Sequence, residues 1–192
     1  MQLEDGKGQG YFAGVTNENQ LQARAETHTM QHHASLFYGQ AFQIIGDFAA
    51  LNNNTYRILH IKNVDPNRFL VVTYIRLEVV GASGGDFGSP NTYFQFGNGV
   101  TYASGGTIVT PVNVNFTSGN AALVEAYDNN PTLTGTFLEY DRWYPDANGS
   151  MQTFNKEGSV ILGLNNELTI SLTTNHTAGT AYARVSFFMA GK

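Results

Sequence analysis

The sequence of 192 residues contains no cysteine, which excludes disulfides, thiolate catalysis and cysteine-based zinc sites. Charged residues make up only 13% of the chain, about half of the ~25% that soluble domains usually carry. The net charge is −5 and the ten Lys and Arg residues are scattered, so the basic face that a nucleic-acid partner requires is missing. No run approaches ~18 consecutive apolar residues, so no membrane-spanning helix is predicted.

The scarcity of charge leaves a surface built from Asn, Thr, Gln, Ser and Gly. Such a surface favours a protein that packs against neighbours, because burying Asn or Thr costs less free energy than burying Lys or Glu. A plain extracellular β-protein is the alternative that composition leaves open. Hydrophobic residues make up 42% of the chain, enough for one domain with a substantial core.

Alternating apolar and polar residues predict strands at residues 56–64 and 69–80. Residues 65–68 between them read Asp-Pro-Asn-Arg, where Pro66 presets the backbone for a turn and Asn67 tolerates its third position. We therefore expect these two strands to form a hairpin around which the chain is organised.

Further short strands are expected along the rest of the chain. They fall at residues 20–28, 36–50, 92–97, 107–116, 121–127, 132–140, 151–154, 160–164, 167–173 and 181–189, with 160–164 pairing with 167–173. Residues 29–35 fit either a helical turn or a continued strand. No stretch of ten or more residues has helical apolar spacing. The sequence therefore predicts an all-β fold, an antiparallel β-sandwich of jelly-roll or Greek-key type.

The front of the chain differs from the sandwich that follows it. Residues 1–19 are predicted to be an extended, glycine-rich arm, and residues 20–192 the sandwich domain. The arm's Gly-Lys-Gly-Gln-Gly run, residues 6–10, does not fit a phosphate site, because no strand precedes it and Tyr11 and Phe12 follow where a helix should begin. An arm that docks through its backbone is the interpretation we favour.

The histidines and acids supply the remaining candidate chemistry. His28 and His32 would share a face of a helical turn and could bind a metal, whereas in a strand His32 and His33 point to opposite sides. We favour surface or interface histidines and predict no metal or other cofactor. The acids that could support glycoside hydrolysis are Glu125, Asp128, Glu139, Asp141 and Asp146. The spacing of these acids in the sequence says nothing about the separation of ~5–9 Å between two carboxylates that this reaction needs.

Binding of a glycan without hydrolysis is a separate possibility. Trp143 and Tyr144 offer aromatic surfaces for a sugar to stack on, and Asp146 follows them in a loop. Jelly rolls include lectin domains.

The opening of the chain resembles that of small virion proteins of tailed bacteriophages. The resemblance is carried by Glu4-Asp5-Gly6-Lys7-Gly8-Gln9-Gly10-Tyr11, by the following Val15…Asn17…Asn19…Leu21…Ala23…Ala25…Thr27 and by the His32-His33 pair. Later likenesses are Leu59-His60-Ile61-Lys62-Asn63, Thr110-Pro111-Val112-Asn113-Val114-Asn115 and Ser118-Gly119-Asn120. The resemblance as a whole is strongest over about the first 80 residues.

The resemblance implies a structural role on the virion, assembled in the host cytoplasm, and no catalytic residues. The expected function is a non-enzymatic capsid decoration or cement protein that braces capsomers through its arm. The interface residues expected in that arm are Asp5, Gly6, Gly8, Gly10, Tyr11 and Phe12. Expected partners are the major capsid protein or other virion proteins. The chain is also expected to form a homo-oligomer, with a trimer favoured. The alternative is a receptor- or glycan-binding module of a fibre or tail, with Trp143, Tyr144 and Asp146 on its binding face.

Overall fold

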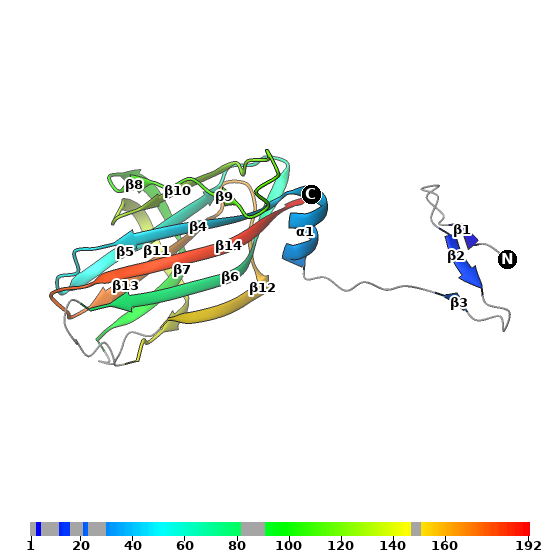
Figure 1. The fold of residues 1–192 in the computed structure, drawn as a ribbon. Coiled ribbons are helices and arrows are strands. Elements are labelled where there is room, and N and C mark those ends of the chain that lie inside the picture. The colour runs from blue at the N-terminus through cyan, green and yellow to red at the C-terminus, as the bar shows by residue number, and fades with distance from the viewer. Residues whose placement is uncertain (1–2, 5–11, 16–20, 23–29, 82–90, 147–150) are drawn as a thin grey trace.

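The computed structural model describes residues 3–4, 12–15, 21–22, 30–81, 91–146 and 151–192. Two antiparallel sheets pack face to face, which confirms the predicted all-β sandwich (Figure 1). The six-stranded sheet contains, in spatial order, β11 (Thr132–Trp143), β7 (Tyr93–Ser104), β13 (Glu167–Thr174), β5 (Asn54–Asn63), β10 (Val124–Asp128) and β8 (Thr107–Ile108). The five-stranded sheet contains β12 (Gln152–Leu162), β6 (Arg68–Val80), β14 (Thr180–Gly191), β4 (Ala41–Phe48) and β9 (Val112–Asn113).

The pairing of the long strands is that of a jelly roll. Taken in chain order, the first long strand pairs with the last, the second with the seventh, the third with the sixth and the fourth with the fifth. These pairs are β4–β14, β5–β13, β6–β12 and β7–β11. A long antiparallel hairpin rolled into two sheets gives this pattern. The short strands β8, β9 and β10 lie between β7 and β11 in sequence and extend the sheet edges beside β4 and β5.

The expected hairpin between residues 56–64 and 69–80 is wrong, although both segments are strands. β5 pairs with β10 and β13, whereas β6 pairs with β12 and β14, so residues 65–68 form a corner between the two sheets. Asp65 is buried at this corner and accepts hydrogen bonds from the Asn67 backbone N–H and the Arg68 side chain. The expected pairing of residues 160–164 with 167–173 fails in the same way, because β12 and β13 lie in opposite sheets.

The expected strand at residues 36–50 is half correct. Its second part is β4, but residues 36–38 end helix α1 (Met30–Tyr38), and the chain turns sharply before β4. Gly39 makes this turn possible, because it adopts a φ of 56° and its N–H bonds back to the Ser35 carbonyl as a left-handed helix cap. The helix leaves no helical apolar pattern in the sequence, because among residues 31–38 only Ala34 is buried, so the aromatic and β-branched run resembles one strand.

The core between the sheets is filled by fully buried aromatic and aliphatic side chains from both layers. Phe42 and Phe187 stack with ring centroids 5.7 Å apart in the five-stranded sheet, opposite Phe94 and Phe96 of the six-stranded sheet. No helix in the described parts of the chain is long and apolar enough to cross a membrane.

A separate small antiparallel sheet forms from the N-terminal segment. It consists of β1 (Leu3–Glu4), β2 (Phe12–Val15) and β3 (Leu21–Gln22). β3, expected within the sandwich domain, therefore pairs with β2 of the arm.

Candidate functional site around helix α1

Helix α1 packs on the outer face of the five-stranded sheet, at the end near the C-terminus (Figure 1). Ala34 contacts a small second core that also contains Ala41, Val71 and Phe188. A β-bulge at Thr73 lies two residues after Val71 of this core, and the Thr73 hydroxyl donates a 2.8 Å hydrogen bond to the Gln31 side chain of the helix. The bulge leaves the Val71 side chain on the outer face of the sheet, where it forms part of the apolar surface against which α1 packs.

The C-terminal end of α1 is held by the loop that follows β9. Three asparagine side chains of this segment donate hydrogen bonds of 2.8 Å to backbone carbonyls at the end of the helix. The pairs are Asn113 with Gly39, Asn115 with Ser35 and Asn120 with Tyr38. The bonds to Gly39 and Tyr38 satisfy carbonyls at the helix end, and the Ser35 carbonyl accepts the Asn115 amide in addition to the Gly39 N–H, so the hydrogen bonds join the loop to the helix.

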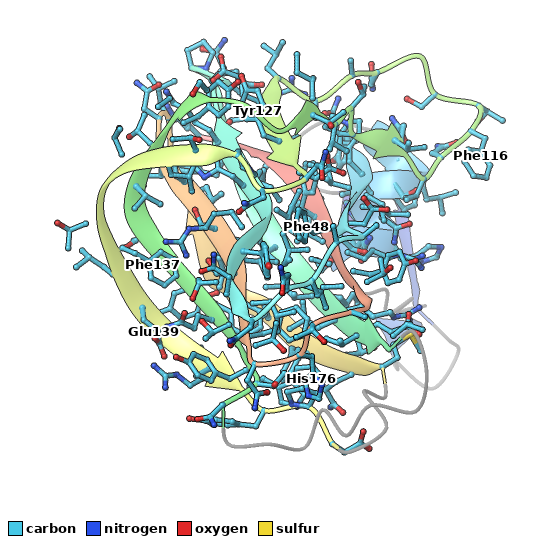
Figure 2. The ribbon with its side chains drawn as sticks, turned by 90° about the vertical axis from the view of Figure 1, so that its left-hand side faces the viewer. Phe48, Phe116, Tyr127, Phe137, Glu139 and His176 are labelled. Carbon is cyan, nitrogen blue, oxygen red and sulfur yellow. The ribbon has the colours of Figure 1, made fainter. Side chains whose placement is uncertain are left out.

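The surface of the helix and this loop exposes large apolar side chains. We call it the α1 surface and define it by Leu36, Phe37, Tyr38, Val112, Val114 and Phe116. Their exposed fractions range from 36% for Val114 to 89% for Phe116, which points outward from the loop (Figure 2). Exposed apolar groups gathered on one surface are typical of interaction sites.

The histidines considered as metal ligands lie on or next to this helix. His32 and His33 are exposed on α1, and the His33 ring lies 4.8 Å from that of Phe37. His28 lies outside the described residues. Among the described residues no three His, Cys, Asp or Glu side chains gather closely enough to hold a metal ion.

The predicted arm residues lie mostly outside the described part of the chain. The arm residues outside the described part are Asp5, Gly6, Gly8, Gly10 and Tyr11. Phe12 is described and is the first residue of β2. The seven residues 23–29 join β3 to α1. A chain of that length spans at most about 28 Å when fully extended, so the small N-terminal sheet is tethered within that distance of Met30, the first residue of α1.

The predicted glycan face presents one aromatic ring that is about half exposed and one that is largely packed. The Trp143 indole stacks on Phe94 at 5.5 Å and meets the Phe154 ring edge-on at 5.8 Å. Tyr144 is 51% exposed and lies 5.6 Å from Tyr93. Asp146 itself is exposed.

Two of the acids considered for hydrolysis are in ion pairs. The Arg142 guanidinium contacts both oxygens of Glu139, at 2.7 and 2.8 Å, and holds the pKa of that carboxyl below its usual value. Asp141 lies 2.6 Å from the Lys156 ammonium. Glu139 thus pairs with a residue of its own strand β11, and Asp141 pairs with Lys156 of β12 in the other sheet.

The residues of the α1 surface were not found from the sequence, because their aromatic and β-branched character indicated a strand. The signal that could have found them is Gly39 followed by a new alternating run, which marks a helix end. A scan against protein-family models and a comparison with curated proteins both find no match.

Proposed function

We propose that this chain is a non-enzymatic virion structural protein, a capsid decoration or cement protein that attaches to neighbouring virion subunits. The observation that supports the proposal is the exposed α1 surface, held to the loop after β9 by hydrogen bonds, on the same nine-residue helix that the N-terminal segment joins at Met30. A partner bound by residues 1–19 is kept close to this surface by the short tether. The two contacts would act together, since tethering raises the effective concentration of the second site.

The partner's contacting surface is expected to be apolar and uncharged. The α1 surface has no acidic or basic side chain apart from the neighbouring histidines, so it offers no ion pair to a charged partner. The major capsid protein or another virion protein would therefore cover Phe37 and Phe116 with aliphatic or aromatic side chains. Large aromatic residues in such positions commonly contribute much of the binding energy of an interface.

The test is attachment of purified chain to capsids that lack it, measured by co-sedimentation. Deleting residues 1–14 is expected to abolish attachment and leave the thermal unfolding temperature unchanged. Replacing both Phe37 and Phe116 by Ser is expected to weaken attachment by about tenfold or more. The control is Ile108→Ser, which removes an equally exposed apolar side chain from β8, at the opposite end of the sandwich (Figure 1).

Wild-type attachment of the deletion variant would contradict the role of the arm, and wild-type attachment of the double Ser variant would contradict that of the α1 surface. Light scattering of the full chain adds the oligomeric state. A trimer that survives the deletion would assign assembly to the sandwich itself.

The second candidate, a receptor- or glycan-binding module, is favoured by the exposed Tyr144 ring, which lies beside the half-buried ring of Tyr93 on the β7–β11 side. Since the Trp143 indole packs against the core, its replacement would also disturb the fold. Tyr144→Ala is the cleaner variant. A glycan-array signal that Tyr144→Ala removes would support this candidate, and a signal that it leaves unchanged would count against this face.

A further inference from the structure

Beyond the end that α1 covers, no helix or strand of the described residues packs on the outer face of the five-stranded sheet. Its outward side chains form rows across the strands, fixed by the register of β4, β14, β6 and β12. One row contains Asp47, Tyr182 and Glu78; the next contains Ile45, Arg184, Arg76 and Thr153; the third contains Gln43, Ser186, Tyr74 and Asn155.

Two arginines lie side by side at the centre of this face. Arg184 and Arg76 are direct cross-strand partners, and both are half-buried. The Arg76 Nε donates a 3.2 Å hydrogen bond to the Thr153 hydroxyl, and within the described residues neither guanidinium reaches a carboxylate at ion-pair distance. Like charges directly opposite each other destabilise a sheet. An anion placed between them would remove that cost.

Two depressions open on either side of the arginine pair and share it as a common wall. The first has a volume of about 240 Å³ and adds Gln43, Tyr74 and Ser186 to the pair and Thr153. The second has a volume of about 300 Å³ and adds Ile45, Met151, Tyr182 and Glu78. These volumes lie at or just below the lower end of the range of about 300–1,000 Å³ that small-ligand sites occupy.

The side chains around the arginines define the chemistry of the ligand. Guanidinium groups bind a carboxylate through paired N–H donors. On one side, Gln43 and Ser186 offer an amide and a hydroxyl to sugar hydroxyls. On the other side, the Tyr182 ring offers an apolar surface and Glu78 can accept from a hydroxyl.

We propose that this face binds an acidic saccharide, with the sugar carboxylate on Arg76 and Arg184 and the adjoining rings in the two depressions. This site is distinct from the α1 surface and does not depend on attachment to a particle. It also differs from the Trp143–Tyr144 face, which lies on the β7–β11 side of the sandwich. The sequence could not reveal it, because residues 76 and 184 become neighbours only through the pairing of β6 with β14.

The experiment is isothermal titration of the full-length chain with uronic-acid and sialic-acid oligosaccharides and with their carboxyl-reduced, neutral counterparts. Wild-type protein is expected to bind at least one acidic oligosaccharide about tenfold or more tightly than its neutral counterpart. Arg184→Gln and Arg76→Gln are each expected to reduce that affinity by about tenfold or more. The control is Lys62→Gln, which removes a cation from the other sheet and is expected to leave the affinity unchanged.

The arginine variants are expected to fold at least as well as wild type, because each removes a like-charge contact. Equal binding of acidic and neutral sugars, absence of binding to both, or affinity that survives both arginine changes would overturn the proposal. Inorganic sulfate or phosphate bound as tightly as the acidic oligosaccharide would overturn the saccharide assignment, since a simple anion site would then explain the pair.

Discussion

His60 gives the sharpest prediction about stability. It is fully buried on β5, its Nδ1 lies 2.9 Å from the Thr169 hydroxyl, and its Nε2 has no hydrogen-bond partner within the described residues. Burial, together with the nearby charge of Lys62, lowers the pKa of His60 from 6.5 to about 4. The neutral imidazole is therefore the form that the folded state retains.

Acid is expected to lower the free energy of unfolding, because on acidification the unfolded chain binds a proton at His60 before the folded chain does. Between pH 6.5 and about pH 4, the unfolded chain protonates His60 and the folded chain does not, so acid favours unfolding. The free energy of unfolding is expected to fall by about 2.5 kcal/mol from this residue alone between pH 7.5 and pH 4.5. Above pH 7.5 both states carry the neutral ring and the effect vanishes.

The assay is urea unfolding at pH 7.5 and pH 4.5 for wild type and His60→Asn. The asparagine amide can still bond to Thr169 but does not titrate in this range, so the variant should lose about 2.5 kcal/mol less than wild type on acidification. His32→Asn, which changes an exposed histidine on α1, is the control and should keep the wild-type loss. An equal loss in wild type and His60→Asn would refute the reasoning.

Three further changes test the packing of the sandwich. Gly97→Ala would place a Cβ 2.5 Å from the Phe137 ring and 2.6 Å from the Leu138 carbonyl oxygen. Urea unfolding should therefore show a free energy of unfolding that is lower by about 1–3 kcal/mol. Burial raises the pKa of the Asp65 carboxyl, but hydrogen bonds from the Asn67 N–H and the Arg68 side chain outweigh it and lower the pKa overall. Asp65→Asn should therefore lower the free energy of unfolding by about 1.5–3 kcal/mol at pH 7. The difference between variant and wild type should shrink as the pH falls below 3.8, because the carboxyl of the wild type then becomes protonated. Phe187→Ala should cost about 3–5 kcal/mol by leaving a cavity in the core; a thermal unfolding temperature equal to that of wild type would contradict the assigned packing.

The strand content and fold class were predictable because they depend on local patterns. Alternating apolar residues mark the half-buried strands, and no ten-residue stretch has helical spacing, in agreement with a single helix of nine residues among the described parts. The turn at residues 65–68 was also readable from Pro66 and Asn67. The absence of cysteine excluded disulfides, thiolate catalysis and cysteine-based zinc sites without reference to the fold, and the scattered basic residues argued against a nucleic-acid partner.

Strand partners were decided only by the tertiary structure. A turn such as residues 65–68 can close a hairpin or carry the chain across to the other sheet, and the choice depends on the packing of segments more than a hundred residues apart. The pairing of Arg76 with Arg184, the burial of His60 against Thr169 and the capping of α1 by residues 113–120 all follow from such long-range contacts. Sequence periodicity specifies which face of a strand a residue occupies. It does not specify which strand lies beside it, because backbone hydrogen bonding is the same for every partner.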